Sequence, residues 1–282
     1  MSEPTINKMD IIRRMKEGEA LYVLISLCTK CPYVVCDPET FDDKVFVYFD
    51  MEDAKKEWER LRQEKIPVNV AKLETKQFLY FYTSLYTLGI NAIAVKDGEK
   101  ELLVQLNEVV MRADPKNQPE GHVWVENPQL HLTALYLMQE VRRNPEAIKT
   151  QEMKDLQEEI GADFNKGKYI QPVQKEGSGI PLLKMAQGEK YQPIFTDILE
   201  FQKFNKGGQL RPLVIEAAKV PQILALEACG VVINPLGINL PMKINRPAAA
   251  GAGAPAGAKA AAAAGAKAPA ADAAKADGQK NN

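Results

Sequence analysis

The sequence predicts an α+β (mixed α/β) fold of two tandem copies of a small module, each a mixed sheet with covering helices, followed by a disordered tail. Helical and strand-type apolar patterns succeed one another twice, in the same order, along the 282 residues. A hydrophobic content of 45% and a charged content of 26% are typical of a globular chain. From residue 247 onward the chain carries no large apolar side chain, so it cannot bury enough surface to order itself.

Module 1, residues 1–111, begins with a predicted helix over 5–18, where Met9, Ile12 and Met15 share one face and Gly18 is a plausible end. Three β-branched and aromatic segments follow at 21–28, 32–37 and 44–50 and predict strands. A helix over 51–65 is expected next, with Asp50 as its N-cap. The remaining pattern predicts a strand over 66–74, a helix over 75–89 and a closing strand pair at 91–97 and 101–106.

Module 2, residues 150–246, repeats this order. A helix over 151–167 precedes predicted strands at 168–174, 180–186 and 191–197. The helix after them, 198–205, has Asp197 and Glu200 at the spacing of an N-cap and its reciprocal acceptor. A strand over 210–217, a helix over 220–230 with Pro221 in its first turn, and strands over 231–236 and 239–244 complete the copy.

Individual positions also align between the two copies, for example Phe49-Asp50 with Phe195-Thr196 and Leu88-Gly89-Ile90 with Cys229-Gly230-Val231. Residues 112–149 form a linker that opens with a Pro/Gly/Asn loop and continues as a predicted helix over 127–144. That helix would bridge the two modules or cap one of them. Residues 247–282 form the predicted disordered Ala/Gly/Pro/Lys tail.

The composition and the N-terminal sequence favour a cytoplasmic location. A formal net charge of −1 gives no global field that would attract nucleic acid or an anionic membrane. The N-terminal sequence is a poor signal peptide, because acidic residues precede the basic ones and its apolar run is short. No apolar stretch approaches the roughly 20 residues needed to span a bilayer, so no membrane insertion is expected. Four cysteines, three of them clustered, do not suggest a disulfide framework in a chain of this size.

The cysteine cluster Cys28, Cys31 and Cys36 is the candidate metal site in the sequence. A Cys-x-x-Cys pair can hold half of a tetrahedral zinc site or form a redox couple. However, the two histidines, His122 and His131, lie in the linker, and the pair straddles a turn between strands rather than a helix N-terminus. The favoured interpretation is three small apolar side chains on a hairpin, with metal and redox roles as alternatives. No cofactor is expected, with zinc as the alternative.

An aromatic stretch in the helix over 75–89 offers a possible interaction face, formed by Phe78, Tyr80, Phe81 and Tyr82. A core stripe is the favoured interpretation, and Tyr80 lies on the other side of the helix. His131, on an apolar helix, is expected to be a packing residue. No catalytic residue is expected, because nucleotide-binding loops and a Gly-x-Ser-x-Gly elbow are absent and two histidines in this context make a Cys-His system improbable.

Two short motifs lie in module 2. A predicted strand ends in Pro-x-Phe-Thr, formed by Pro193, Phe195 and Thr196. A Gly-Val-x-Ile-Asn-Pro segment is formed by Gly230, Val231, Ile233, Asn234 and Pro235. With these motifs, residues 150–245 resemble the SseB-like family (enhanced serine sensitivity protein SseB), specifically its N-terminal domain. Module 1 has the same order of elements but departs from both motifs. The resemblance implies a bacterial protein and carries over no catalytic residue.

We therefore expect a non-enzymatic cytosolic protein that acts through protein–protein contacts, with the aromatic helix of module 1 and the Asn-Pro edge of module 2 as candidate surfaces. The sequence specifies neither the partner nor the oligomeric state. The alternative is a sensor that binds a metal or a small molecule through the hairpin of Cys28, Cys31 and Cys36.

Overall fold

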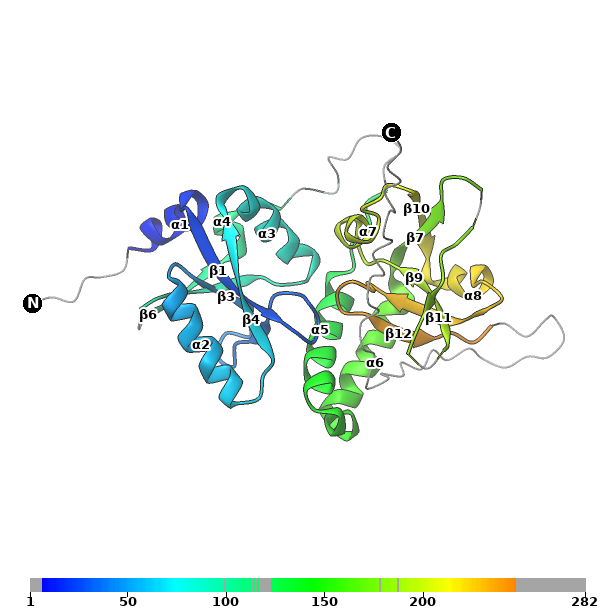
Figure 1. The fold of residues 1–282 in the computed structure, drawn as a ribbon, viewed down its shortest axis with the longest axis horizontal. Coiled ribbons are helices and arrows are strands. Elements are labelled where there is room, and N and C mark those ends of the chain that lie inside the picture. The colour runs from blue at the N-terminus through cyan, green and yellow to red at the C-terminus, as the bar shows by residue number, and fades with distance from the viewer. Residues whose placement is uncertain are drawn as a thin grey trace, which may run out of the picture.

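The computed structural model describes residues 7–98, 100–112, 114, 116, 123–177, 179–186 and 188–246. Helices and mixed sheets alternate through both halves (Figure 1), which confirms the predicted α+β class. The predicted tail, residues 247–282, lies outside the described residues. None of the helices in the described ranges is long and apolar enough to cross a membrane.

Module 1 is one mixed sheet with the strand order β4-β1-β3-β5-β6, and β2 pairs with β3 beside that path. Strand β3 runs parallel to β5 and antiparallel to β1 and β2. The elements are α1 (Lys8–Glu17), β1 (Ala20–Ser26), β2 (Val34–Cys36), β3 (Asp43–Tyr48), α2 (Met51–Gln63), β4 (Val68–Glu74), α3 (Thr75–Thr87), β5 (Ala92–Asp97), β6 (Lys100–Gln105) and α4 (Leu106–Val109).

Helix α2 shows how local sequence builds module 1. Asp50 begins the helix, with its side chain accepting a hydrogen bond from the Glu52 amide. Ala54 and Leu61 form part of its buried face. Trp58 Nε1 donates to the Val68 carbonyl at 2.8 Å, which ties the helix to the edge strand β4. The predicted helix and its predicted N-cap are thus both present.

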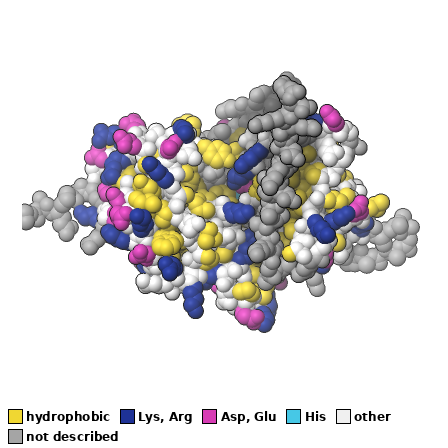
Figure 2. All heavy atoms as spheres, viewed as in Figure 1, with side chains coloured by type: hydrophobic (Ala, Val, Ile, Leu, Met, Phe, Trp, Pro, Cys, Tyr) yellow, Lys and Arg dark blue, Asp and Glu magenta, His cyan; other side chains and the backbone are white. Residues whose placement is uncertain are grey.

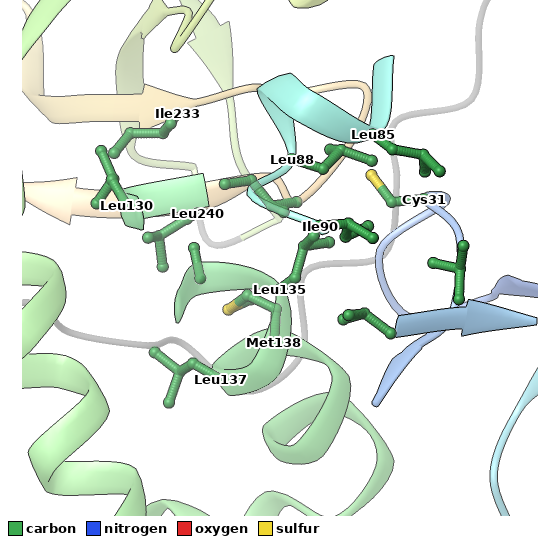
Figure 3. Packing of buried hydrophobic residues seen from close by; sticks show 14 of the residues in the cluster. Cys31, Leu85, Leu88, Ile90, Leu130, Leu135, Leu137, Met138, Ile233 and Leu240 are labelled. Carbon is green, nitrogen blue, oxygen red and sulfur yellow. The ribbon is translucent and has the colours of Figure 1, made fainter. Parts of the chain in front are cut away.

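The linker helix α5 (Pro128–Arg143) lies between the two sheets (Figure 1) and packs against α3 and β2 of module 1 and against α6 (Gln151–Lys166) of module 2. A 3-10 turn, η2 (Pro145–Lys149), connects α5 to α6. Because α5 is apolar on several sides, one contiguous cluster of buried side chains runs through both modules. Figure 3 shows this packing, in which Leu130, Leu135 and Met138 of α5 lie together with Cys31 of module 1 and with Ile233 and Leu240 of module 2.

Module 2 has a two-stranded sheet, β10-β7, and a four-stranded sheet, β12-β11-β9-β8, joined by an isolated bridge between Ile170 and Phe195. Across that bridge the order is β10-β7-β9-β11-β12, which is the order of module 1. The remaining elements are β7 (Lys168–Gln174), β8 (Leu183–Lys184), β9 (Lys190–Ile194), α7 (Ile198–Phe204), β10 (Leu210–Glu216), η3 (Ala217–Lys219), α8 (Val220–Ile223), β11 (Ala228–Ile233) and β12 (Leu240–Lys243).

Two prolines explain why the ladder between β7 and β9 is reduced to one bridge. Pro172 in β7 and Pro193 in β9 lack the N–H groups that a continuous ladder needs. Two fully buried amide side chains occupy the gap: Gln192 Nε2 donates to Gln171 Oε1 at 2.7 Å. Gln171 Nε2 in turn donates to the Pro172 carbonyl at 3.2 Å. Side-chain amides therefore replace main-chain pairing at this point of the sheet.

The structure corrects several predictions in module 2. The helix predicted over 220–230 is α8, only Val220–Ile223, because β11 begins at Ala228 and pairs in parallel with β9. The strand predicted over 180–186 is two residues long. The proposed alignment of Asp50 with Thr196 is one residue out of register, because Asp197 is the N-cap equivalent to Asp50.

Gly89 and Gly230 are not equivalent either. Gly89 follows α3 with φ +80°, whereas Gly230 lies inside β11. A Cβ on Gly230 would lie 2.0 Å from the Met242 carbonyl oxygen, so β12 approaches this backbone too closely for any side chain. The motif glycine of module 2 therefore serves strand packing.

Candidate functional site

Six polar side chains converge under helix α5, where the two modules meet. We call them the joint cluster. Module 1 contributes one side chain from the turn after β1, α5 contributes the histidine, and the remaining four come from the ends of β9 and β11 and the first turn of α7. All six are buried. They are Cys31, His131, Thr196, Asp197, Glu200 and Asn234.

Thr196 and Asn234 join the carboxyl ends of the parallel strands β9 and β11. The Thr196 amide donates to Asn234 Oδ1 at 3.0 Å, and Asn234 Nδ2 donates to Thr196 Oγ1 at 2.8 Å. Asn234 has φ +46°, and its carbonyl accepts hydrogen bonds from the Gly237 and Asn239 amides. Asparagine tolerates this left-handed conformation better than most residues. Asn234 is thus both a turn residue and a member of a buried polar site.

His131 completes the cluster from α5 and is entirely buried. Its Nδ1 lies 3.3 Å from Thr196 Oγ1 and 3.7 Å from Asp197 Oδ2, the latter an ion-pair distance rather than a hydrogen bond. Asp197 also accepts hydrogen bonds from the Thr196 hydroxyl at 2.7 Å and from the Glu200 amide at 3.0 Å. The carboxylate is therefore held by its own helix while it faces the imidazole.

Charge in the cluster favours a protonated His131. Burial by itself lowers the pKa of His131, but Asp197, Cys31 and Glu200 raise it, to about 10. Burial raises the pKa of Asp197, whereas His131, Thr196 and the Glu200 amide lower it, so that overall it lies below its ordinary value. A buried imidazolium–carboxylate pair between α5 and module 2 is the resulting state.

Cys31 and Glu200 both lie close to Gly237. A Cβ on Gly237 would be 3.1 Å from Glu200 Oε2 and 3.5 Å from Cys31 Sγ. Glu200 Oε1 accepts from Lys203 Nζ at 2.5 Å, while Oε2 is buried without a hydrogen-bond partner among the described residues. Gly237 thus packs against a side chain of each module.

Cys31, His131 and Asp197 are the residue types of a cysteine nucleophile, its base and an orienting carboxylate. Access decides against that chemistry in this conformation. Cys31 is 2% exposed and His131 and Asp197 are 0% exposed, so no substrate atom can reach the sulfur. In this state the cluster can hold the modules together, but it cannot attack a substrate.

Arg142, near the end of α5, makes a second polar connection between the modules. Its Nη1 donates to the Cys28 carbonyl of module 1, and its Nη2 donates to the Asn239 carbonyl of module 2 at 2.8 Å. Burial lowers the pKa of Arg142 from its ordinary value. Because a guanidinium presents several donors in a rigid plane, one side chain can satisfy carbonyls from both modules.

A groove of about 860 Å³ opens beside Arg142, and we call it the joint groove. One wall is strand β2 with the residues before β4, and the other is the end of α5 with the start of α6. Apolar side chains such as Val35, Ile66 and Leu156 line it, and Glu140, Arg143, Glu146 and Glu152 bring charge to it. Cys28 and Cys36 also line this groove.

The three hairpin cysteines therefore lie in different environments. Cys31 is buried in the joint cluster, Cys28 is half-buried and Cys36 is exposed. Burial raises the pKa values of the Cys28 and Cys36 thiols. Within the part of the chain that the structure describes, no three His, Cys, Asp or Glu side chains are placed to hold a metal ion. The alternative zinc site at Cys28, Cys31 and Cys36 gains no support from this geometry.

The residues that carry the family resemblance divide into two roles. Thr196 and Asn234 belong to the joint cluster, whereas Gly230 permits close strand packing. Phe195 packs edge-on against Phe201 of α7, and Pro193 and Pro235 are buried. The Asn-Pro edge expected to be a docking surface is therefore interior.

The aromatic stretch of α3 is a core stripe, as the favoured interpretation predicted, rather than an interaction face. Phe78, Phe81 and Tyr82 are core residues, with Tyr82 donating to the Met15 carbonyl at 2.9 Å. Tyr80 is 49% exposed, as its position on the other side of the helix predicted. A second groove, of about 490 Å³, runs between α3 and the β7-β10 edge.

Sequence reasoning missed His131, Asp197 and Arg142 as a group. His131 was interpreted as a packing residue, and Asp197 was identified only as an N-cap. A histidine and an arginine on the apolar side of a predicted helix are the available signal, since such groups are rarely buried without partners. Nothing in the sequence places those partners in module 2.

Comparison with known proteins adds little to this description. No family model matches the sequence, and no curated protein matches it, so the resemblance to the SseB-like family stays a prediction. Among solved structures, Tic22 from Anabaena, described as a protein transport protein, is 13% identical over 77% of this chain and 86% of its own, with a TM-score of 0.22. Tic22 from Plasmodium falciparum is 10% identical over 74% of this chain and 84% of its own, with a TM-score of 0.23. These TM-scores are too low to assign either the fold or a function.

Proposed function

We propose that this protein is a non-enzymatic cytosolic binding protein that holds a segment of a partner protein in the joint groove. The observation that carries the proposal is the groove itself, at about 860 Å³ and lined by residues of module 1, α5 and module 2. Its volume is in the range of grooves that bury a ligand. Its apolar walls with charged residues beside them resemble the anatomy of protein interfaces.

The state of the thiols supports the non-enzymatic and cytosolic parts of the proposal. All four cysteines are free, which suits a reducing compartment. The Cys31–His131–Asp197 group is closed to solvent. Cys28 and Cys36 line the joint groove, but the described residues of that groove include no histidine that could act as a general base for either thiol. A resemblance to the SseB-like family agrees with this proposal, because it carries over no catalytic residue.

The construction of the joint supports a groove of fixed shape. Arg142 bonds both modules, the joint cluster fastens α5 to module 2, and a single apolar cluster continues through both. A groove whose walls are fixed relative to each other loses less entropy when it binds. In the view of Figure 2, basic and acidic side chains are interspersed over module 1, which suits a protein partner better than a nucleic acid.

Site-specific photo-crosslinking tests the proposal. A benzophenone amino acid is placed at Glu152, which lines the groove from α6, and in a matched protein at Glu158, which is exposed on the same helix outside the groove. In native lysate we expect a discrete adduct from position 152 that mass spectrometry assigns to one protein. Adding the charge-reversing Glu146→Lys change, which replaces a carboxylate that lines the groove, should reduce that adduct.

Identical adduct patterns from positions 152 and 158, or no adduct from position 152 in replicate lysates, would count against groove binding. An enzymatic activity that is lost in the Cys31→Ala variant would overturn the proposal that the protein is non-enzymatic, without bearing on groove binding. Cys31→Ala removes that thiol while leaving the groove residues in place, so the two parts of the proposal can fail independently.

A further inference from the structure

The edge of strand β2 is incompletely paired where it borders the joint groove. Strand β3 uses one edge for β5 and the other for β1 and β2 in succession. Strand β4 pairs with β1, and the ladder between them ends at the pair of Val68 and Ser26. Ile66 and Pro67, just before it, line the groove. Among the described residues, no strand therefore pairs with the edge of β2 that faces away from β3. The groove lies along that edge.

A side-chain amide from α5 stands where the missing strand would be. The Val34 amide donates to Gln139 Oε1 at 3.2 Å, and Gln139 Nε2 donates to the Val34 carbonyl at 3.1 Å. This two-bond pattern is the one that a residue of a neighbouring antiparallel strand would make with its own N–H and C=O groups. Gln139 thus satisfies one main-chain position of an otherwise open edge.

The register of β2 places a second open position in the groove. Along a strand, residues two apart direct their main-chain groups to the same edge. Val34 directs its groups away from β3, toward Gln139, so Cys36 directs its groups the same way. Cys36 is exposed and lines the groove. Val34 and Cys36 together offer two N–H and two C=O groups to an incoming chain.

Charge at the groove favours a basic chain. Glu140, Glu146 and Glu152 line the groove together with one cation, Arg143, which is already paired with Glu140. Glu146 is paired with Lys149 at 2.5 Å. With Lys149 counted, three carboxylates face two cations, which leaves an acidic surplus of one charge, at Glu152. Complementary charge speeds association and selects partners.

We propose that the edge of β2 accepts an extended, basic segment of the partner protein as an added strand, whose main chain takes the place of the Gln139 amide. This inference rests on the proposed function and specifies its binding mode. Main-chain pairing supplies affinity, and alternate side chains of the segment lie against the apolar walls of the groove. Gln139 keeps the edge from pairing at random when no partner is bound.

Titration with a synthetic peptide tests this mode. The probe is a short capped peptide that alternates lysine and valine, added to ¹⁵N-labelled full-length protein and followed by the amide resonances. We expect Val34, Cys36 and the Gln139 side-chain amide to shift together. Gln139→Ala removes the competing amide, so binding should tighten roughly fivefold or more, as expected when two hydrogen bonds no longer compete.

Matched controls separate main-chain pairing from other contacts. A peptide of the same sequence with alternate nitrogens methylated keeps its side chains but loses the donors, and it should not bind. A glutamate–valine peptide should bind at least tenfold more weakly. Gln129→Ala, an exposed glutamine on the same helix, should leave affinity for the first peptide unchanged.

Equal binding of the methylated peptide, or no effect of Gln139→Ala on affinity, would overturn strand addition while leaving groove binding intact. Strand addition would also be overturned if Gln139→Ala protein showed no shift at Val34 and Cys36 with millimolar peptide. The crosslinking experiment fails or succeeds independently, because it detects any partner in the groove whatever its conformation.

Discussion

Asp50 and Asp197 hold the same place in the two modules, yet they lie in opposite environments. Each follows a strand parallel to a later one, and each begins a helix by accepting a main-chain hydrogen bond. Asp50 accepts from the Glu52 amide at 2.6 Å and is exposed. Asp197 accepts from the Glu200 amide at 3.0 Å, is 0% exposed and lies 3.7 Å from His131.

The linker helix accounts for the difference. Helix α5 lies over the ends of β9 and β11 and brings His131 against Asp197, whereas in the described part of the chain no histidine approaches the N-terminus of α2. The same local chemistry, a carboxylate at a helix N-terminus, is therefore a surface cap in module 1 and half of a buried ion pair in module 2. Repetition of a module fixes the cap but not its environment.

Removing the two carboxylates tests this difference most directly. Asp197→Ala should lower the free energy of unfolding by about 3–5 kcal/mol, because it leaves an unpaired buried imidazolium. Asp50→Ala should cost about 0.5–2 kcal/mol, the range for losing a surface N-cap. Chemical denaturation of both variants measures the difference, and equal losses would show that the burial of Asp197 adds nothing.

Asn234→Ala is expected to cost about 2–3 kcal/mol. The substitution leaves the buried Thr196 amide without its acceptor and places alanine at φ +46°. Asn234→Gly removes the same amide but accepts the left-handed backbone, so it should cost less than the alanine variant. If both variants unfold at the same denaturant concentration, backbone conformation contributes nothing at this turn.

The pH dependence of the free energy of unfolding tests the buried ion pair of His131 and Asp197. The pKa of His131 in the folded state is raised to about 10 from 6.5, so its contribution is complete below pH 6.5 and is lost as pH rises toward 10. Stability should fall by up to about 1.4 kcal/mol per pH unit in that window. His131→Gln should flatten the curve relative to wild type. The slope depends on Cys31, Asp197 and Glu200, which face the imidazole.

Removing one buried tyrosine hydroxyl from each module should give the smallest changes in stability, and the two changes should differ in sign. Tyr48 of module 1 is buried and its hydroxyl has no hydrogen-bond partner among the described residues, and burial raises its pKa. Tyr169 of module 2 donates to the Phe164 carbonyl at 2.9 Å. Tyr48→Phe should be neutral or stabilise by up to about 1 kcal/mol, whereas Tyr169→Phe should cost about 1 kcal/mol. Thermal melting of the two variants shows whether each substitution raises or lowers the melting temperature.

Local patterns predicted most helices and strands. The N-caps at Asp50 and Asp197 were identified from spacing, because capping depends only on residues within one turn. The helix predicted over 220–230 failed for the opposite reason: pairing of β11 with β9, a contact between distant segments, ended it at Ile223. The favoured interpretation of the aromatic stretch in α3 was also correct: Phe78, Phe81 and Tyr82 are core residues, and Tyr80 lies on the outer side.

The sequence by itself determined the α+β class, the repeated order of elements and the N-caps at Asp50 and Asp197, since these follow from periodicity and local capping preference. Only the tertiary structure decided that Cys31, His131 and Asp197 meet, that Arg142 binds carbonyls of both modules, and that Gln139 occupies the edge of β2. The physical reason is the path of α5. A linker helix packed against both modules brings together side chains that are far apart in sequence, and no local pattern records which of them will meet.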